Sequence, residues 1–129
     1  MSWQEYVDVE LIGSGYCKTA SIIGMDGTEH AVSLNGHIEK NEITNLISLF
    51  GDAKKRQAGN KLKLKGNECV IKFGGDRTIS CQIEDSKDGF ICVKTKQTII
   101  VTGYGDYISH DDCWNVIQKF SDYLILKGF

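Results

Sequence analysis

The second half of the chain is a succession of short apolar segments at about ten-residue spacing, and this pattern constrains the fold most strongly. Residues 61–65 alternate strictly between lysine and leucine, which places the leucines on one face of a strand and the lysines on the other. Glycine and aspartate turns separate the segments that follow. Short strands at this spacing predict an antiparallel meander. Its expected strands are 61–65, 69–73, 78–83, 90–94 and 98–101.

Helices and a further hairpin are expected outside this meander. Ser2 followed by Glu5 is a capping-box pattern that predicts a short helix through Leu11, ended by Gly13 and Gly15. Apolar residues at three- and four-residue spacing predict two longer helices, and an Asp-Gly pair between apolar runs predicts a hairpin. These elements are hairpin strands at 20–23 and 30–33, a middle helix at 39–50 and a final helix at 113–127.

Composition and pattern together predict one α+β domain over residues 1–129. Fourteen glycines and no proline require turns built from Gly, Asn and Asp, which favours a β-rich chain. Fifteen basic against seventeen acidic residues argue against nucleic acid as a partner. No apolar run approaches the ~18 residues of a membrane span, and no leader sequence is expected. We expect an antiparallel sheet of six or seven strands, with both terminal helices together on one face.

The cysteines and histidines form neither a metal-binding nor a catalytic pattern. All are widely scattered, without the paired spacing of zinc ligands, so neither a metal nor a cofactor is expected. Cysteines inside apolar runs predict reduced core thiols in a cytosolic protein. Because phosphate loops and a nucleophile elbow are missing, only a Cys–His pair would support an enzyme. The residues are Cys17, Cys69, Cys81, Cys92, Cys113, His30, His37 and His110.

Aromatic residues at the two ends of the chain predict a binding groove. Trp3 and Tyr6 project from the same side of the first helix, and Tyr123 lies on the last helix one turn after Lys119. If the two helices lie side by side, these rings form a shallow groove of the kind that binds polyproline helices. The alternative is that Trp3 and Tyr6 belong to the core.

The opening residues 1–8, Met-Ser-Trp-Gln-Glu-Tyr-Val-Asp, resemble the start of profilins, of the protozoan and plant type. The resemblance runs from end to end of the chain; its opening motif is specific and its middle is not. It continues in Leu-Ile-Gly-Ser-Gly at 11–15, Ala-Ser-Ile-Ile-Gly-Met-Asp-Gly at 20–27, Phe-Ile-Cys-Val-Lys-Thr at 90–95, and Asn-Val-Ile-Gln-Lys and Asp-Tyr-Leu-Ile in the final helix.

This resemblance implies the profilin fold, with smaller helices on the second face of the sheet. It also implies a monomeric, non-enzymatic protein of the cytoplasm and cytoskeleton. The implied partners are monomeric actin, proline-rich proteins such as formin-type assembly factors, and phosphoinositide membrane surfaces. By position, the polyproline groove falls on Trp3, Tyr6, His30, Lys119 and Tyr123.

His30 departs from the family, because it stands where a second tryptophan is usual in a Trp-Ala-x-Ser stretch. The change removes a large stacking surface and predicts weaker binding of proline-rich ligands. From its own sequence context, His30 is more typical of a half-buried strand residue after a turn than of a groove residue.

The resemblance also implies an actin-binding surface on the middle strands and at the start of the last helix. Strict alternation places Cys69, Ile71 and Phe73 on one face, so that Lys72 points the other way. The alternative for these basic residues is a solvated strand surface. The positions carried over are Lys72, Arg77, Trp114 and Asn115.

Two further departures leave an alternative function open. Gln82-Ile83-Glu84 replaces a stretch that is commonly basic in the family, and His110-Asp111 replaces a Pro-Gly pair. The alternative is a polyproline-binding adaptor with weak or lost actin binding.

A dense basic run follows the middle helix and predicts a phosphoinositide contact. Each Lys or Arg beside an anionic leaflet contributes about 1 kcal/mol, so half of the run would hold a headgroup reversibly. The alternative is a solvated sheet face whose lysines guard an edge strand. The run comprises Lys54, Lys55, Arg56, Lys61, Lys63 and Lys65.

Overall fold

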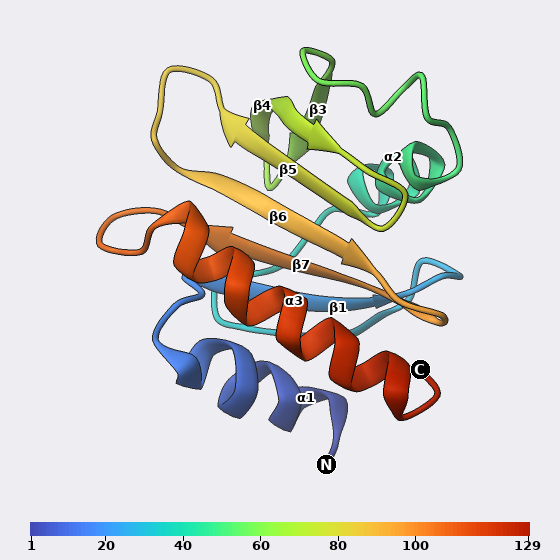
Figure 1. Ribbon diagram of the computed structural model, residues 1–129, viewed down its shortest axis with the longest axis vertical. Helices are drawn as coiled ribbons and strands as arrows, with labels where there is room; N and C mark the ends of the chain where they lie inside the picture. The colour runs from blue at the N-terminus through green and yellow to red at the C-terminus, as the bar shows by residue number, and fades with distance from the viewer.

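The computed structural model describes residues 1–129 and contains a seven-stranded antiparallel sheet (Figure 1). The strand order is β2-β1-β7-β6-β5-β4-β3, so the predicted meander is confirmed and the first hairpin joins it beside β7. The strands are β1 (Thr19–Gly24), β2 (Glu29–Val32), β3 (Lys61–Leu64), β4 (Asn67–Gly74), β5 (Thr78–Ile83), β6 (Gly89–Lys94) and β7 (Thr98–Tyr104).

The predicted helices are confirmed, with changes at their ends. The Ser2 hydroxyl accepts the Glu5 backbone N–H at 3.1 Å, and the Glu5 carboxylate accepts that of Ser2 at 3.3 Å, so the capping box forms. Gly15, with a φ of 80°, ends this first helical segment. The last helix begins three residues earlier than expected, because Ser109 caps it. The helices are α1 (Trp3–Glu5), continued by a π-helix (Tyr6–Leu11) and a 3₁₀ turn (Ile12–Ser14), then α2 (Lys40–Phe50) and α3 (His110–Leu126).

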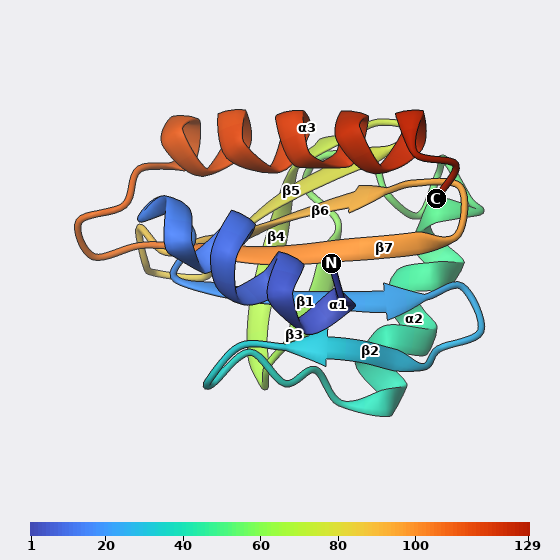
Figure 2. The same ribbon diagram turned by 90° about the horizontal axis from the view of Figure 1, so that it is seen from below.

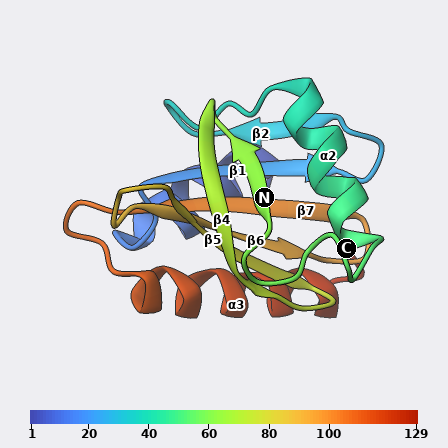
Figure 3. The ribbon, with the colours of Figure 1, turned by 90° about the horizontal axis from the view of Figure 1, so that it is seen from above.

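The sheet separates two hydrophobic cores. The N-terminal helix and α3 lie side by side on one face (Figures 1 and 2), and Val7, Leu11, Ile117 and Leu124 are fully buried there. On the opposite face α2 covers the sheet (Figure 3), above a second core. The predicted placement of the terminal helices is therefore confirmed. A single helix, α2, occupies the second face.

The five cysteines are all buried and free, as expected for core thiols. Cys69, Cys81 and Cys92 lie in the core under α2, whereas Cys17 and Cys113 lie under the terminal helices. Burial raises the pKa of the Cys92 thiol, which keeps it protonated and unreactive. None of the helices is both long enough and apolar enough to cross a membrane.

Candidate functional site

Aromatic rings from both ends of the chain form a continuous row along the terminal helices. The rings of Trp3 and His30 are stacked, with centroids 5.6 Å apart and planes inclined by 12°. Trp3 also meets Tyr6 edge-on at 5.9 Å, and Tyr6 meets Tyr123 edge-on at 6.1 Å. The structure therefore brings four of the five predicted groove residues into direct succession. We call these four residues the aromatic row.

Exposure differs strongly within the aromatic row. Trp3 is half-buried and His30 is exposed, while the side chain of Tyr123 is 40% exposed. Tyr6 is only 6% exposed, so the alternative that placed it in the core is correct for this residue. A hydrogen bond with Tyr123, together with burial, raises the pKa of Tyr6. Tyr6 thus supports the row, whose accessible ring faces come from its neighbours.

A hollow continues the aromatic row along α3. Its volume is about 410 Å³, and it is lined by Tyr123, whose ring also meets that of Tyr6. Lys119, the fifth predicted groove residue, is exposed on its wall one turn before Tyr123, with Glu10 opposite on the N-terminal helix. The hollow offers apolar ring surface with one cation and one carboxylate at its margin.

Two residues that the sequence analysis did not single out hold Trp3 in place. The side chain of Gln4 donates to the Val32 carbonyl at 2.9 Å and accepts its N–H at 3.3 Å, which ties the N-terminal helix to edge strand β2. The Phe129 ring meets Trp3 edge-on at 5.1 Å, and the Gln97 N–H donates to the Phe129 carbonyl. Nothing in the local pattern marks these contacts, because they join residues far apart in the sequence.

A second candidate surface arises from a β-bulge in β4. Ile71 lies opposite Cys81, but Phe73 lies opposite Ser80, so Lys72 is an extra residue in the strand. The prediction that Phe73 shares the inward face of Ile71 is therefore wrong. The bulge shifts the alternation by one residue, and Phe73 is 50% exposed on the outer side. Lys72 is exposed there as predicted.

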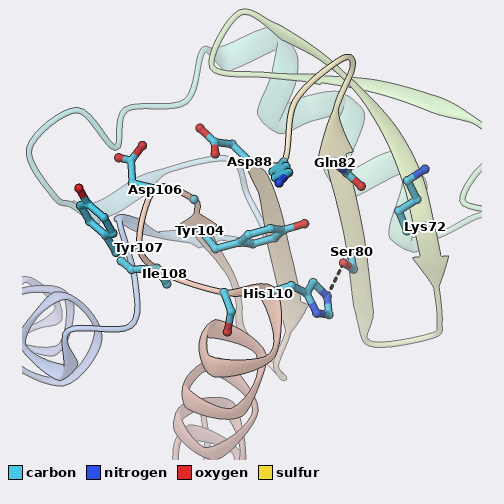
Figure 4. A pocket seen from close by; sticks show the side chains of 12 residues that line it. Lys72, Ser80, Gln82, Asp88, Tyr104, Asp106, Tyr107, Ile108 and His110 are labelled. Carbon is cyan, nitrogen blue, oxygen red and sulfur yellow. Dashed lines mark hydrogen bonds between the residues drawn. The ribbon is translucent and has the colours of Figure 1, made fainter.

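Phe73 and α3 together build an aromatic cluster on this outer side. The Phe73 ring meets Trp114 edge-on at 5.8 Å, and Trp114 lies over His110 at 5.6 Å. His110 Nε2 is 2.9 Å from the Ser80 hydroxyl oxygen (Figure 4). Its Nδ1 is 2.9 Å from the Asp111 carboxylate. This His110 cluster borders a pocket of about 690 Å³ that Lys72 also lines.

The predicted actin positions lie on one continuous side of the molecule. Lys72 and Arg77 flank the exposed end of β4 and the start of β5, and Trp114 and Asn115 lie on the first turns of α3. Asn115 is exposed, while Trp114 is half-buried and its ring contacts those of Phe73 and His110. Arg77 forms an exposed ion pair with Asp122 of α3 at 3.6 Å. We call this side the β4–α3 surface.

Arg56 does not belong to an exposed basic surface, and this prediction is wrong. The residue is 7% exposed. Its Nη1 donates to the carbonyl oxygens of Leu49 and Phe50 at 3.3 and 3.1 Å, and its Nη2 pairs with Asp76 at 2.8 Å. Arg56 thus caps the C-terminal end of α2, where cations are stabilised by the helix dipole.

The rest of the basic run is only partly available. Lys61 forms an ion pair with Glu84, whose hydrogen bond raises the pKa of the lysine. Lys65 is half-buried, and burial lowers its pKa. The exposed lysines without an ion pair are Lys54, Lys55 and Lys63.

Comparison with known proteins identifies close relatives over the whole chain. A family model described as Profilin matches residues 1–129. The profilin of Drosophila melanogaster is 35% identical over 129 residues, covering 100% of both chains. The solved structure of Acanthamoeba castellanii profilin IB is 36% identical, with a TM-score of 0.91 over 99% of this chain and 100% of that one.

Two more distant solved structures contain partners. A LokiProfilin2/rabbit actin complex has a TM-score of 0.78 and 16% identity, covering 97% of this chain and 98% of that one. Mouse profilin IIa in complex with a double repeat from the FH1 domain of mDia1 has a TM-score of 0.78 and 20% identity over 100% of both chains. At these identities the likeness to the present chain is one of fold.

Proposed function

The chain belongs to the profilin family, and we propose that it binds monomeric actin and proline-rich proteins through two separate surfaces. The observation that carries the proposal is the aromatic row, in which partly exposed rings of Trp3 and Tyr123 from the two terminal helices lie in one succession with the exposed His30. The second surface is the β4–α3 surface. Trp114 and Tyr123 are nine residues apart on α3, which corresponds to roughly 13 Å along the axis, so the two surfaces have different centres on this helix.

The aromatic row suits a left-handed polyproline helix. Proline rings stack on aromatic faces, and the ligand is already extended, so little conformational entropy is lost on binding. Trp3 and Tyr123 supply exposed ring area, Tyr6 supports them from below, and Lys119 lies at the margin. Proline-rich assembly factors of the formin type are the proposed ligands, in keeping with the FH1 repeat bound to the mouse relative.

The β4–α3 surface suits a protein partner. It combines exposed cations, Lys72 and Arg77, with the half-exposed ring of Phe73 packed on Trp114. Aromatic and basic side chains dominate the energetics of protein interfaces. We assign monomeric actin to this surface, as in the complex of the distant relative with rabbit actin. Binding one actin conformation more tightly than another would alter its nucleotide exchange without catalysis by this chain. This role places the protein in the cytoplasm, at the cytoskeleton.

Charge reversal on the β4–α3 surface is the test of the actin assignment. The double variant Lys72→Glu, Arg77→Glu is expected to weaken binding of actin monomers about tenfold or more. Charges at the rim of an interface change both the association rate and the stability of the bound complex. Retention on a polyproline resin should stay normal. The matched control is Lys40→Glu, Lys54→Glu, which makes the same charge change on the α2 side.

Unchanged actin affinity in the β4–α3 variant would place the interface elsewhere. Absence of actin binding by the unmodified chain, with normal polyproline retention, would instead support the second candidate function, a polyproline-binding adaptor. Its favouring observation is that the acidic residues Glu84 and Asp111 stand where the resemblance to the family implies a commonly basic stretch and a Pro-Gly pair.

We further propose weak, electrostatic attachment to phosphoinositide membranes through Lys54, Lys55 and Lys63. Substituting Lys54 and Lys55 with Gln is expected to lower vesicle affinity by about 1 kcal/mol for each lysine that faces the leaflet. Binding should fall between low and physiological salt, where the Debye length is about 8 Å. Vesicle sedimentation measures both effects, with Lys40→Gln, Lys96→Gln as the matched control. Salt-independent binding, or none at low salt, would leave these lysines as a solvated surface.

A further inference from the structure

Each of the two tryptophans in this chain lies against a histidine, one pair in each proposed binding surface. Trp3 stacks on His30, and Trp114 lies over His110, both at 5.6 Å. The two pairs differ in their hydrogen bonding. His30 has no side-chain hydrogen bond, whereas both ring nitrogens of His110 have partners on different elements. His110 therefore connects β5 to the first turn of α3, beneath the actin-binding side.

The hydrogen bonds of His110 fit two protonation states. In the neutral ring, Nδ1–H donates to the Asp111 carboxylate and Nε2 accepts the Ser80 hydroxyl. In the protonated ring both nitrogens donate, and the Ser80 hydroxyl oxygen becomes an acceptor. Ser80 has no other side-chain hydrogen bond, so its hydroxyl is free to turn. Both states keep the same contacts and differ by one positive charge.

This order of contacts resembles a nucleophilic Ser–His–Asp arrangement, but the surroundings do not suit catalysis. Ser80 is 2% exposed, and its backbone is paired with β4 on one side and β6 on the other, so its N–H is not a free oxyanion donor. The Asp111 side chain is 93% exposed, where it orients the ring only weakly. The property of His110 that can affect binding is therefore the positive charge that it gains on protonation.

The charges that face His110 determine what its protonation changes. Lys72 on β4 is exposed in the same pocket, and Lys87 lies across it, between β5 and β6. The nearby carboxylates Asp88 and Asp106 share the ammonium group of Lys18, at 3.6 and 3.0 Å. The remaining acidic groups are Asp111, in direct contact, and Asp112 in the same turn of α3; β5 contributes the neutral Ser80 and Gln82, and β7 the phenol of Tyr104.

We propose that His110 makes the actin affinity of the β4–α3 surface depend on pH. Protonation compensates the Asp111 carboxylate and places a cation against Trp114, so the surface around Lys72 becomes more basic and binds an acidic partner surface more tightly. Histidine is the side chain that proteins use most often as a charge switch under physiological conditions. The inference rests on the proposed actin binding.

The first measurement follows His110 in the free protein. Trp3→Phe leaves Trp114 as the single tryptophan, and its fluorescence should change between pH 8 and pH 5.5 as the histidine beneath it gains charge. The change should disappear in Trp3→Phe, His110→Gln. It should persist in Trp3→Phe, His30→Gln, the matched control. A flat titration in the parent, or one that survives loss of His110, would overturn the inference without involving actin.

The second measurement compares actin affinity at pH 6.0 and pH 7.5. The unmodified chain should bind about fivefold more tightly at pH 6.0, or ~1 kcal/mol at 1.4 kcal/mol per tenfold. His110→Gln should show a smaller ratio of the two affinities. Because the same actin is used throughout, any titration of actin itself contributes equally to every protein compared. His30→Gln should keep the full ratio. Equal ratios in all three proteins would overturn the inference and leave the proposed function standing. No actin binding at either pH would overturn both this inference and the proposed actin binding. Retention on a polyproline resin shows in each case that the protein is folded.

Discussion

Replacement of Trp3 by alanine is expected to abolish retention on a polyproline resin. Trp3 occupies the centre of the aromatic row, where its ring contacts His30, Tyr6 and Phe129. Removing a central aromatic anchor from an interface costs about 2–4 kcal/mol, which is a loss of roughly 30- to 1,000-fold in affinity. Because the ring is half-buried and joins the edge of the core, we expect the thermal midpoint to fall by only a few degrees.

The matched control for this variant is Trp114→Ala, which removes the other half-buried tryptophan. Trp114 lies near the start of α3, whereas the aromatic row lies near its end, at Tyr123. The Trp114→Ala protein should retain polyproline binding. A Trp3→Ala protein that unfolds would show that Trp3 belongs to the core, which is the alternative stated from the sequence.

If Trp3→Ala unfolds, His30→Trp still tests the groove, because a larger ring at the exposed end of the aromatic row should increase affinity for proline-rich peptides. No increase would show that the ligand does not reach this end.

The order and type of the elements were predictable because local patterns determine them. Strict alternation in β3, the Asp-Gly turn before β2 and the capping box at Ser2 each depend on residues close in sequence. The bulge at Lys72 was not predictable, because nothing in the local pattern distinguishes a shifted strand from a regular one. Its effect was large, since one extra residue moves Phe73 from the expected core face to the surface.

The residues of the candidate site also fall into two groups: those that local sequence patterns predict and those that only the tertiary structure reveals. The aromatic row was predictable, since Trp3 and Tyr6 share one side of a helix and the opening motif resembles profilins. The contributions of Gln4, Phe129 and His110 require the tertiary structure, because each contact joins segments at least 28 residues apart. A sequence pattern shows which side chains can interact along one element. It does not show which elements come to lie beside them.

Arg56→Met is expected to lower the free energy of unfolding by about 3 kcal/mol. Removing the buried guanidinium leaves the Phe50 carbonyl oxygen without a donor, and the Leu49 carbonyl keeps only its backbone donor, the Asp52 N–H. Leu49 and Phe50 would lose their side-chain partner at the end of α2, and the ion pair with Asp76 would disappear. For a chain of this size the thermal midpoint should fall by roughly 10 °C. Methionine keeps the apolar stem of the side chain, so lost packing is a small part of the effect.

Lys55, the exposed neighbour of Arg56, provides the control that distinguishes a role in stability from a role in membrane attachment. Lys55→Met removes the same charge one residue earlier, where the side chain is exposed, and should leave the thermal midpoint unchanged within about a degree, as surface substitutions do. Vesicle binding should respond in the opposite sense: weaker in Lys55→Met, and unchanged in Arg56→Met at a temperature where that variant is folded. Equal thermal midpoints for the two variants would mean that the buried guanidinium contributes no net stability. Its hydrogen bonds would then only offset the desolvation of its charge, as buried ion pairs often do.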